Sequence, residues 1–95
     1  MLFWVVMEPK ILAAIFASKY RKEILLILAD EHLDTPSEMV KKMLKKGYKS
    51  ANMQNLSANL RWLKNHGLIK VEVERRKGKL YKITNEGKKY AIKFC

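Results

Sequence analysis

The chain has a single cysteine, Cys95, at the last of its 95 positions. An intramolecular disulfide is therefore excluded, and so is a metal site built from the cysteines of one chain. The scarcity of cysteine also predicts a cytoplasmic protein. Its two histidines, His32 and His66, are too few for a metal site of their own, so no metal or other cofactor is expected.

Long apolar runs are also lacking. The apolar start, Met1–Val6, has six residues before Met7, Glu8 and Pro9. This length is too short for a membrane span or a signal-peptide core, so no membrane partner is expected. We treat residues 1–8 as an apolar N-terminal extension and residues 9–95 as one domain. An added strand, a dimer contact, or translation that starts at Met7 would each explain the extension.

Acidic residues are scarce in the second part of the chain. Residues 1–40 carry four basic and six acidic residues, whereas residues 41–95 carry sixteen basic and three acidic ones. Nucleic acid is the usual partner of such a basic segment. A lysine-rich surface that only keeps the protein soluble is the alternative. No nucleophile–base pair, phosphate-binding glycine loop or zinc motif occurs, so the chain is not expected to be an enzyme.

Apolar residues recur at helical spacing along residues 9–66. They predict a helix that begins at Pro9 and further helices over residues 19–31, 35–46 and 50–66. The first two are either separate or one continuous helix. The expected caps are Ser18, Thr35 with Glu38 in a capping box, and Ser50 or Asn52. Gly47 is expected to end the third helix in a left-handed conformation. In the last two helices the residues expected to be buried are Met39, Val40, Met43, Leu44, Met53, Leu56, Leu60 and Leu63.

After Gly67 the apolar period changes from 3.6 to 2, which predicts a β-hairpin over residues 69–84. Matching the apolar faces pairs Val73 with Tyr81 and Val71 with Ile83. That register leaves residues 76–78 as a three-residue loop. A short last helix begins after Thr84. The fold class is therefore α+β and mostly helical.

Three segments resemble winged helix-turn-helix regulators of the ArsR and MarR types. The run Leu60–Ile69 is similar to their "L-x-x-L-x-x-x-G-L-I" pattern, and residues 76–87 resemble a wing followed by "Y-x-(L/I)-T-x-x-G". Residues 20–25 are similar to the "R-x-x-I-L" segment of the ArsR type. The resemblance implies a winged helix-turn-helix fold in which residues 50–66 form the recognition helix. ArsR-type metal sensors have cysteines near the start of the preceding helix, and this chain has none there.

The resemblance implies that the recognition helix enters the major groove of double-stranded DNA, with its N-terminal part nearest the bases. On a helical wheel, the face opposite the buried stripe carries Ala51 and a run of amides and small residues. The candidates for base contact are Asn52, Gln54, Asn55, Ala58 and Asn59. The alternative is that these amides only decorate a solvated face.

Basic and polar residues beside these positions are candidates for contact with the DNA backbone. They are Lys49, Ser50, Arg61, Trp62 and Lys64 near the recognition helix, and Arg75, Arg76, Lys77, Gly78 and Lys79 at the wing. A charged edge that blocks aggregation would also explain the wing cations. Packing beneath the wing is an alternative for Trp62.

Apolar residues at both ends of the chain exceed what one small domain buries easily, which predicts a homodimer. The dimer candidates are Ile11, Leu12, Ile15, Phe16, Tyr90 and Phe94. The sequence thus favours a sequence-specific DNA-binding regulator, a repressor that acts as a dimer. A winged-helix module that binds protein or RNA, and a sequence-neutral architectural DNA binder, are the alternatives.

Overall fold

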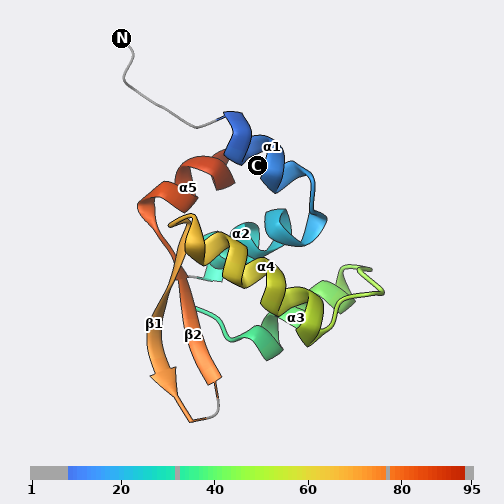
Figure 1. Ribbon diagram of the computed structural model, residues 1–95. Helices are drawn as coiled ribbons and strands as arrows, with labels where there is room; N and C mark the ends of the chain where they lie inside the picture. The colour runs from blue at the N-terminus through green and yellow to red at the C-terminus, as the bar shows by residue number, and fades with distance from the viewer. Residues whose placement is uncertain (1–8, 32, 77, 94–95) are drawn as a thin grey trace.

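The computed structural model describes residues 9–31, 33–76 and 78–93, and five helices and two strands lie within them. In chain order they are α1 (Pro9–Phe16), α2 (Lys19–Glu31), α3 (Pro36–Lys45), α4 (Met53–Asn65), β1 (Ile69–Arg75), β2 (Gly78–Ile83) and α5 (Asn85–Ile92). The β1–β2 hairpin projects from one end of the molecule, and α1 and α5 lie at the other end (Figure 1). The predicted element order and the α+β, mostly helical class are confirmed.

Helix α2 is the centre of the core. Four of its apolar residues, Ile24, Leu25, Ile27 and Leu28, are at most 4% exposed. They pack with apolar residues of the other helices and of the hairpin base, namely Ile15, Met39, Met43, Leu56, Leu60, Leu63, Leu68, Ile69, Ile83, Tyr90 and Ala91. Burial of one such side chain stabilises the fold by about 1.5–3 kcal/mol. The core therefore fixes α4 and the hairpin on α2.

Local sequence signals set the helix ends. The Thr35 hydroxyl accepts a hydrogen bond from the Glu38 N–H, with Pro36 in the first turn of α3. Gly47 has a φ of +100°, which only glycine adopts easily, and it follows the end of α3 as predicted. Helix α1 ends before Ser18, so α1 and α2 are separate helices. The Ser18 hydroxyl accepts a hydrogen bond from the Arg21 N–H, in agreement with its predicted capping role.

The predicted exposure of three residues is wrong. Met53 is 49% exposed, because it is the first residue of α4 and lies beyond the end of the buried stripe. Ala51 was expected on the exposed face, yet it is 8% exposed, because it precedes the helix and helical spacing does not apply to it. Leu44 lies in the last turn of α3 and is 48% exposed.

The hairpin forms, but the predicted register is wrong. Val71 pairs with Tyr81 and Ile69 with Ile83, which is two residues away from the predicted pairing. A shift of two keeps the apolar faces matched, so the alternation alone could not exclude it. A bulge between Val71 and Val73 then adds one residue to β1. Arg75 consequently pairs with Gly78, and the connection shortens to residues 76 and 77, of which residue 77 lies outside the described residues.

Candidate nucleic-acid interface

Helices α3 and α4 are joined by a turn over residues 46–52. The Tyr48 N–H donates a hydrogen bond of 3.0 Å to the Met43 carbonyl, and the Ala51 N–H donates one of 3.1 Å to the Tyr48 carbonyl. Asn52 has an extended backbone and caps α4, since its side-chain oxygen accepts a hydrogen bond of 2.8 Å from the Asn55 N–H. Of the two predicted caps, Ser50 and Asn52, the second is therefore confirmed, and α4 begins at Met53, inside the predicted range of residues 50–66.

A buried carboxylate of α2 holds this turn. Glu23 is 4% exposed, and its carboxylate accepts a hydrogen bond of 3.0 Å from the Tyr48 hydroxyl. The same carboxylate forms an ion pair with Lys46, which follows α3. Burial raises the pKa of Tyr48, and the hydrogen bond to Glu23 and its negative charge raise it further. Sequence reasoning missed Glu23, although a charged residue four positions before Ile27, on the buried side of a helix, was a usable signal.

The outward face of α4 is polar from its first turn to its last. Gln54, Ser57, Ala58 and Arg61 are all exposed, at positions that repeat every three or four residues. No side-chain hydrogen bond of Gln54 occurs in the described part of the chain, so its amide is available to a ligand. Asn55 is half-buried and donates a hydrogen bond of 3.0 Å to the Ser50 carbonyl. A surface of this kind offers donors and acceptors to the edges of bases.

Two of the other candidate amides have internal partners. Asn59 is half-buried, and its side-chain oxygen accepts hydrogen bonds from the Ser18 hydroxyl (3.3 Å) and from Arg21 Nε (3.2 Å). Its side-chain nitrogen donates a hydrogen bond of 2.8 Å to the Asn55 carbonyl. Asn52 uses its nitrogen on the Ser50 carbonyl in addition to its capping bond. Both amides therefore have partners within the fold, although Asn52 is exposed whereas Asn59 is half-buried.

Arg21 connects three helices, a role that sequence reasoning missed. Besides its bond to Asn59, its guanidinium donates a hydrogen bond of 2.7 Å to the Ala14 carbonyl of α1. It also lies over the Trp62 ring, 4.2 Å from the ring centroid. Trp62 in turn stacks on His66 at 3.9 Å. Trp62 is thus half-buried against Arg21, and the alternative that it packs beneath the wing is not supported by these contacts.

The wing is tied to α3 through Asp34, which is 6% exposed. The backbone of Asp34 pairs with that of Tyr81 in β2 through two hydrogen bonds of 3.2 and 2.9 Å. The Asp34 carboxylate accepts a hydrogen bond from the Thr35 N–H (3.0 Å) and forms an ion pair with Lys42 (2.7 Å). The wing therefore extends from the body in a direction that α3 helps to fix.

Between the wing and α4 lies a hollow of about 270 Å³ that we call the α4–wing hollow. Its lining residues come from both elements and from the start of α3: Pro36, Ser57, Leu60, Arg61, Lys64, Asn65, Lys79 and Tyr81. Arg61, Lys64 and Lys79 are exposed cations that border this hollow from the helix and from the strand. Arg75 and Arg76 extend the exposed positive charge toward the wing tip, whereas Lys49 and Ser50 are exposed at the other end of α4. The structure therefore brings together three of the predicted cations, Arg61 and Lys64 of α4 and Lys79 of the wing.

The structure buries some of the predicted dimer residues and exposes others. Ile15 and Tyr90 are 0% and 2% exposed and belong to the core of the monomer, so their assignment to a dimer surface is wrong. Ile11 and Leu12 are half-buried, and Phe94 lies outside the described residues. Phe16 is exposed, as is Ile92, which is 70% exposed and which the sequence analysis did not select.

Within residues 9–31, 33–76 and 78–93, no three histidine, cysteine, aspartate or glutamate side chains gather closely enough to hold a metal ion. No helix formed by these residues has the length and apolar character needed to cross a membrane.

No protein-family model matches the sequence, and no curated protein matches it either. Solved structures do. H. salinarum RosR is similar with a TM-score of 0.73 and 23% identity, over 81% of this chain and 69% of RosR. A cysteine variant of Lactococcus lactis ZitR is similar with a TM-score of 0.68 and 18% identity, over 99% of this chain and 57% of ZitR.

A cysteine variant of E. coli MarR complexed with operator DNA gives a TM-score of 0.67 and 19% identity, over 88% of this chain and 57% of MarR. The chain thus spans between about half and about two thirds of the length of these regulators. All three are winged-helix proteins. The likeness confirms that this chain has the winged helix-turn-helix fold.

Proposed function

We propose that the protein binds double-stranded DNA sequence-specifically and regulates transcription as a homodimeric repressor in the cytoplasm. The observation that carries the proposal is the arrangement of α4 and the wing. Ser57 and Arg61 on the outward face of α4 and Lys79 of β2 border one hollow, so a duplex that contacts one element can contact the other. The complex of the MarR variant with operator DNA, on the same fold, supports this interpretation. No catalytic step is proposed.

Base recognition is assigned to the exposed start of α4. Gln54 is the first candidate, because a glutamine amide can bond to both N6 and N7 of adenine. Ala58 lies one turn later and is exposed, so its methyl group suits a thymine methyl group. The free side-chain oxygen of Asn55 is a further acceptor. Asn52 is exposed and remains a candidate beside its capping role, whereas Asn59 is the weakest candidate, because it is half-buried and both ends of its amide have internal hydrogen bonds.

Backbone contact is assigned to the exposed cations and polar residues beside these positions: Lys49, Ser50, Arg61, Lys64, Arg75, Arg76 and Lys79. Each phosphate that a lysine or arginine neutralises releases condensed cations from DNA and makes binding more sensitive to salt. Trp62 is not included, because Arg21 and His66 cover its two sides.

The homodimer is proposed to form through the end of the molecule that carries α1 and α5, opposite the wing (Figure 1). Phe16 and Ile92 expose large apolar side chains there. Two-fold symmetry would place two half-sites about 10 bp apart in a near-palindromic operator. Light scattering at micromolar concentration should give the mass of two chains, whereas the mass of one chain would contradict the dimer.

The test is selection of bound sequences from random duplex DNA at about 50 mM and about 200 mM salt. A specific regulator should enrich one motif with two-fold symmetry. Gln54→Ala should relax that motif at single positions without changing the salt dependence. Arg76→Ala should weaken all duplexes alike and lower the slope of log affinity against log salt by about 0.9. Lys10→Gln removes one charge from α1, away from α4 and the wing. It should change neither the selected motif nor the salt dependence of binding.

The outcomes also separate the alternatives. Duplex binding without an enriched motif would identify an architectural DNA binder. Absence of duplex affinity would leave a module that binds protein or RNA. If a motif is found, purified transcription from a promoter that carries it should fall when the protein is added, and a rise would contradict the repressor role.

A further inference from the structure

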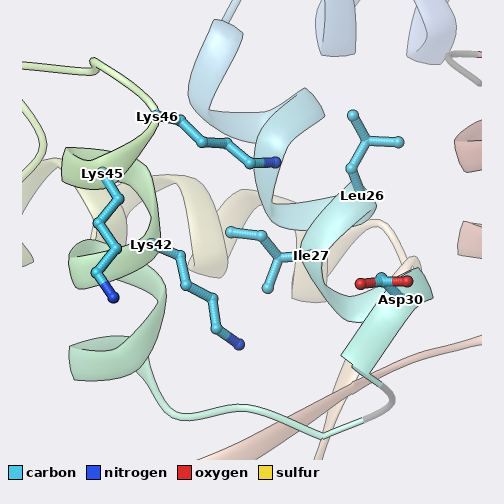
Figure 2. Close-up of a pocket in the computed structure, with 6 residues that line it drawn as sticks. All are labelled: Leu26, Ile27, Asp30, Lys42, Lys45 and Lys46. Atoms are coloured by element: carbon cyan, nitrogen blue, oxygen red, sulfur yellow. The ribbon is translucent and has the colours of Figure 1, made fainter.

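A second hollow lies between α2 and α3, and we call it the α2–α3 groove. Figure 2 shows the six residues that line it: Leu26, Ile27, Asp30, Lys42, Lys45 and Lys46. Its volume is about 360 Å³, within the range of small-molecule sites. None of the α4 or wing residues assigned to DNA lines it. A ligand here would therefore not compete directly with a duplex.

The groove has an aliphatic floor. Ile27 points from α2 into the space between the lysine side chains of α3 (Figure 2). Leu26 is half-buried beside it, and the methylene stems of the lysines add apolar surface. No aromatic side chain lines the groove, so nothing there would stack on a flat ring. The floor therefore suits a flexible aliphatic chain.

The charges at the rim favour an anionic head group. The lining residues include three lysines, Lys42 and Lys45 of α3 and Lys46 just after it. Asp30 of α2 is the one carboxylate among them. Lys45 is exposed and has no ion-pair partner in the part of the chain that the structure describes. Asp30 would repel a carboxylate and so direct it toward Lys45. An ammonium offers three N–H donors, which suits a carboxylate or a phosphate monoester.

We propose that the α2–α3 groove binds a small amphiphilic anion, an aliphatic chain with one carboxylate, and that this ligand regulates DNA binding. The regulatory part rests on the proposed function, whereas the binding part does not. The chain would lie on Leu26 and Ile27, and the carboxylate would bind Lys45 first.

The route from the groove to the DNA-binding elements passes through two of its own lysines. Lys46 is paired with Glu23, which also holds Tyr48 in the turn before α4. Lys42 is paired with Asp34, whose backbone holds Tyr81 in the wing. An anion in the groove competes with both buried carboxylates for these ammonium groups. Binding should therefore loosen the turn and the wing together and lower the affinity for DNA.

Binding is tested directly on the full chain without DNA, by calorimetry and by amide chemical shifts with octanoate as the probe. One octanoate should bind per chain, and the largest shifts should lie along residues 26–30 and 42–46. n-Octylammonium has the same chain with the opposite charge and should bind at least about tenfold more weakly. Equal binding of the two probes, or shifts centred on Phe16 and Ile92 instead, would overturn the site.

Two variants locate the contact. Lys45→Gln keeps the ion pairs of Lys42 and Lys46 and should weaken octanoate binding about three- to fivefold, as expected for one exposed charge pair. Leu26→Glu adds a carboxylate to the floor of the groove and should weaken octanoate binding more than about tenfold. Lys41→Gln removes a charge one position away from the groove lining on the same helix and should have no effect. If Lys45→Gln and Lys41→Gln behave alike, the assignment fails.

The effect of the bound ligand on DNA binding is measured separately. Octanoate should shift the amides of Tyr48 and Tyr81 and should weaken duplex binding at least about fivefold, a typical size for allosteric coupling. At an octanoate concentration that does not saturate the site, the loss should be smaller in Lys45→Gln, because this variant binds octanoate about three- to fivefold more weakly. If octanoate binds in the groove and duplex affinity stays constant, the regulatory role is wrong. Octanoate binding in a protein that binds no duplex would overturn the proposed function but not the site.

Discussion

The Tyr48 hydroxyl donates a hydrogen bond of 3.0 Å to Glu23, a carboxylate that is 4% exposed. Glu23 belongs to α2, whereas Tyr48 lies in the turn that leads from α3 to α4. A buried carboxylate is costly unless its oxygens are bonded, and Tyr48 and Lys46 supply the partners. The position of α4 is therefore set in part by a buried residue of α2 that lies 25 positions before Tyr48.

Replacement of Tyr48 by phenylalanine tests the strength of this contact. A hydrogen bond to a charged group contributes about 1.5–3 kcal/mol, and its loss leaves one oxygen of Glu23 without that donor. Tyr48→Phe should lower the free energy of unfolding by about 1.5 kcal/mol in a urea titration. Tyr20 lies beside Tyr48, with ring centroids 5.9 Å apart and the rings tilted by 53°, but its hydroxyl has no partner among the described residues. Tyr20→Phe should cost less than about 0.5 kcal/mol, and equal losses would contradict the assignment.

The same contact predicts a loss of stability at alkaline pH. Burial, and then the Glu23 hydrogen bond and charge, hold the pKa of Tyr48 above its ordinary value in the folded state. The unfolded chain loses this proton near about pH 10. Above that pH the folded state binds more protons than the unfolded one, so the free energy of unfolding falls as pH rises. The stability difference between the wild-type chain and Tyr48→Phe should be constant from pH 7 to 9 and shrink above about pH 10. A constant difference up to pH 11 would contradict this pKa shift.

The helices were predictable because their signals are local. Thr35, Pro36 and Glu38 mark the start of α3 within four residues, and Gly47 marks its end. The buried face of α2 follows from the spacing of Ile24, Leu25, Ile27 and Leu28. The capping box is only half formed, however. The Thr35 N–H bonds to Asp34 and not to Glu38, because Asp34 is held in place by its backbone pairing with β2.

The positioning contacts were not predictable, because they join residues far apart in the chain. The pairing of Arg21 with Asn59 spans 38 positions, and that of Glu23 with Tyr48 spans 25. A helical wheel made Asn59 a candidate for base contact, but it could not show that Ser18 and Arg21 bond to its side chain. The hairpin register failed for a similar reason, because alternation fixes the faces and leaves shifts of two residues open.

Asn59→Ala separates a structural amide from one that contacts DNA. The change removes the acceptor of Arg21 Nε and of the Ser18 hydroxyl, and it should lower the free energy of unfolding by about 1–2 kcal/mol. The base preferences of the selected DNA motif should not change. Asn65→Ala, at an exposed amide near the end of α4, should cost less than about 0.5 kcal/mol. A relaxed motif with unchanged stability would return Asn59 to the base contacts.

A double-mutant cycle measures how strongly Arg21 and Asn59 are coupled. Arg21→Gln alone should also reduce stability, because it removes the bond to the Ala14 carbonyl and the contact with Trp62. Combined with Asn59→Ala, it should cost about 1 kcal/mol less than the sum of the two single changes, since the shared bond is lost only once. Urea titrations of the four proteins give this value. Strict additivity would show that the hydrogen bond of 3.2 Å contributes nothing.

Gly87→Ala should be the most damaging single change at a glycine of this chain. Gly87 is buried in α5, and a Cβ there would overlap the Leu68 carbonyl oxygen and come within 2.7 Å of the Ile83 side chain. Leu68 and Ile83 form the base of the wing, and the Thr84 N–H already donates to the same Leu68 carbonyl at 3.0 Å. Neither neighbour can move without disturbing the hairpin, so the cost should be about 3 kcal/mol or more. Lys88→Ala, at the next and exposed position, should change stability by less than about 0.5 kcal/mol. Thermal unfolding of the two variants decides the matter, and similar midpoints would show that α5 is not packed this closely on the wing.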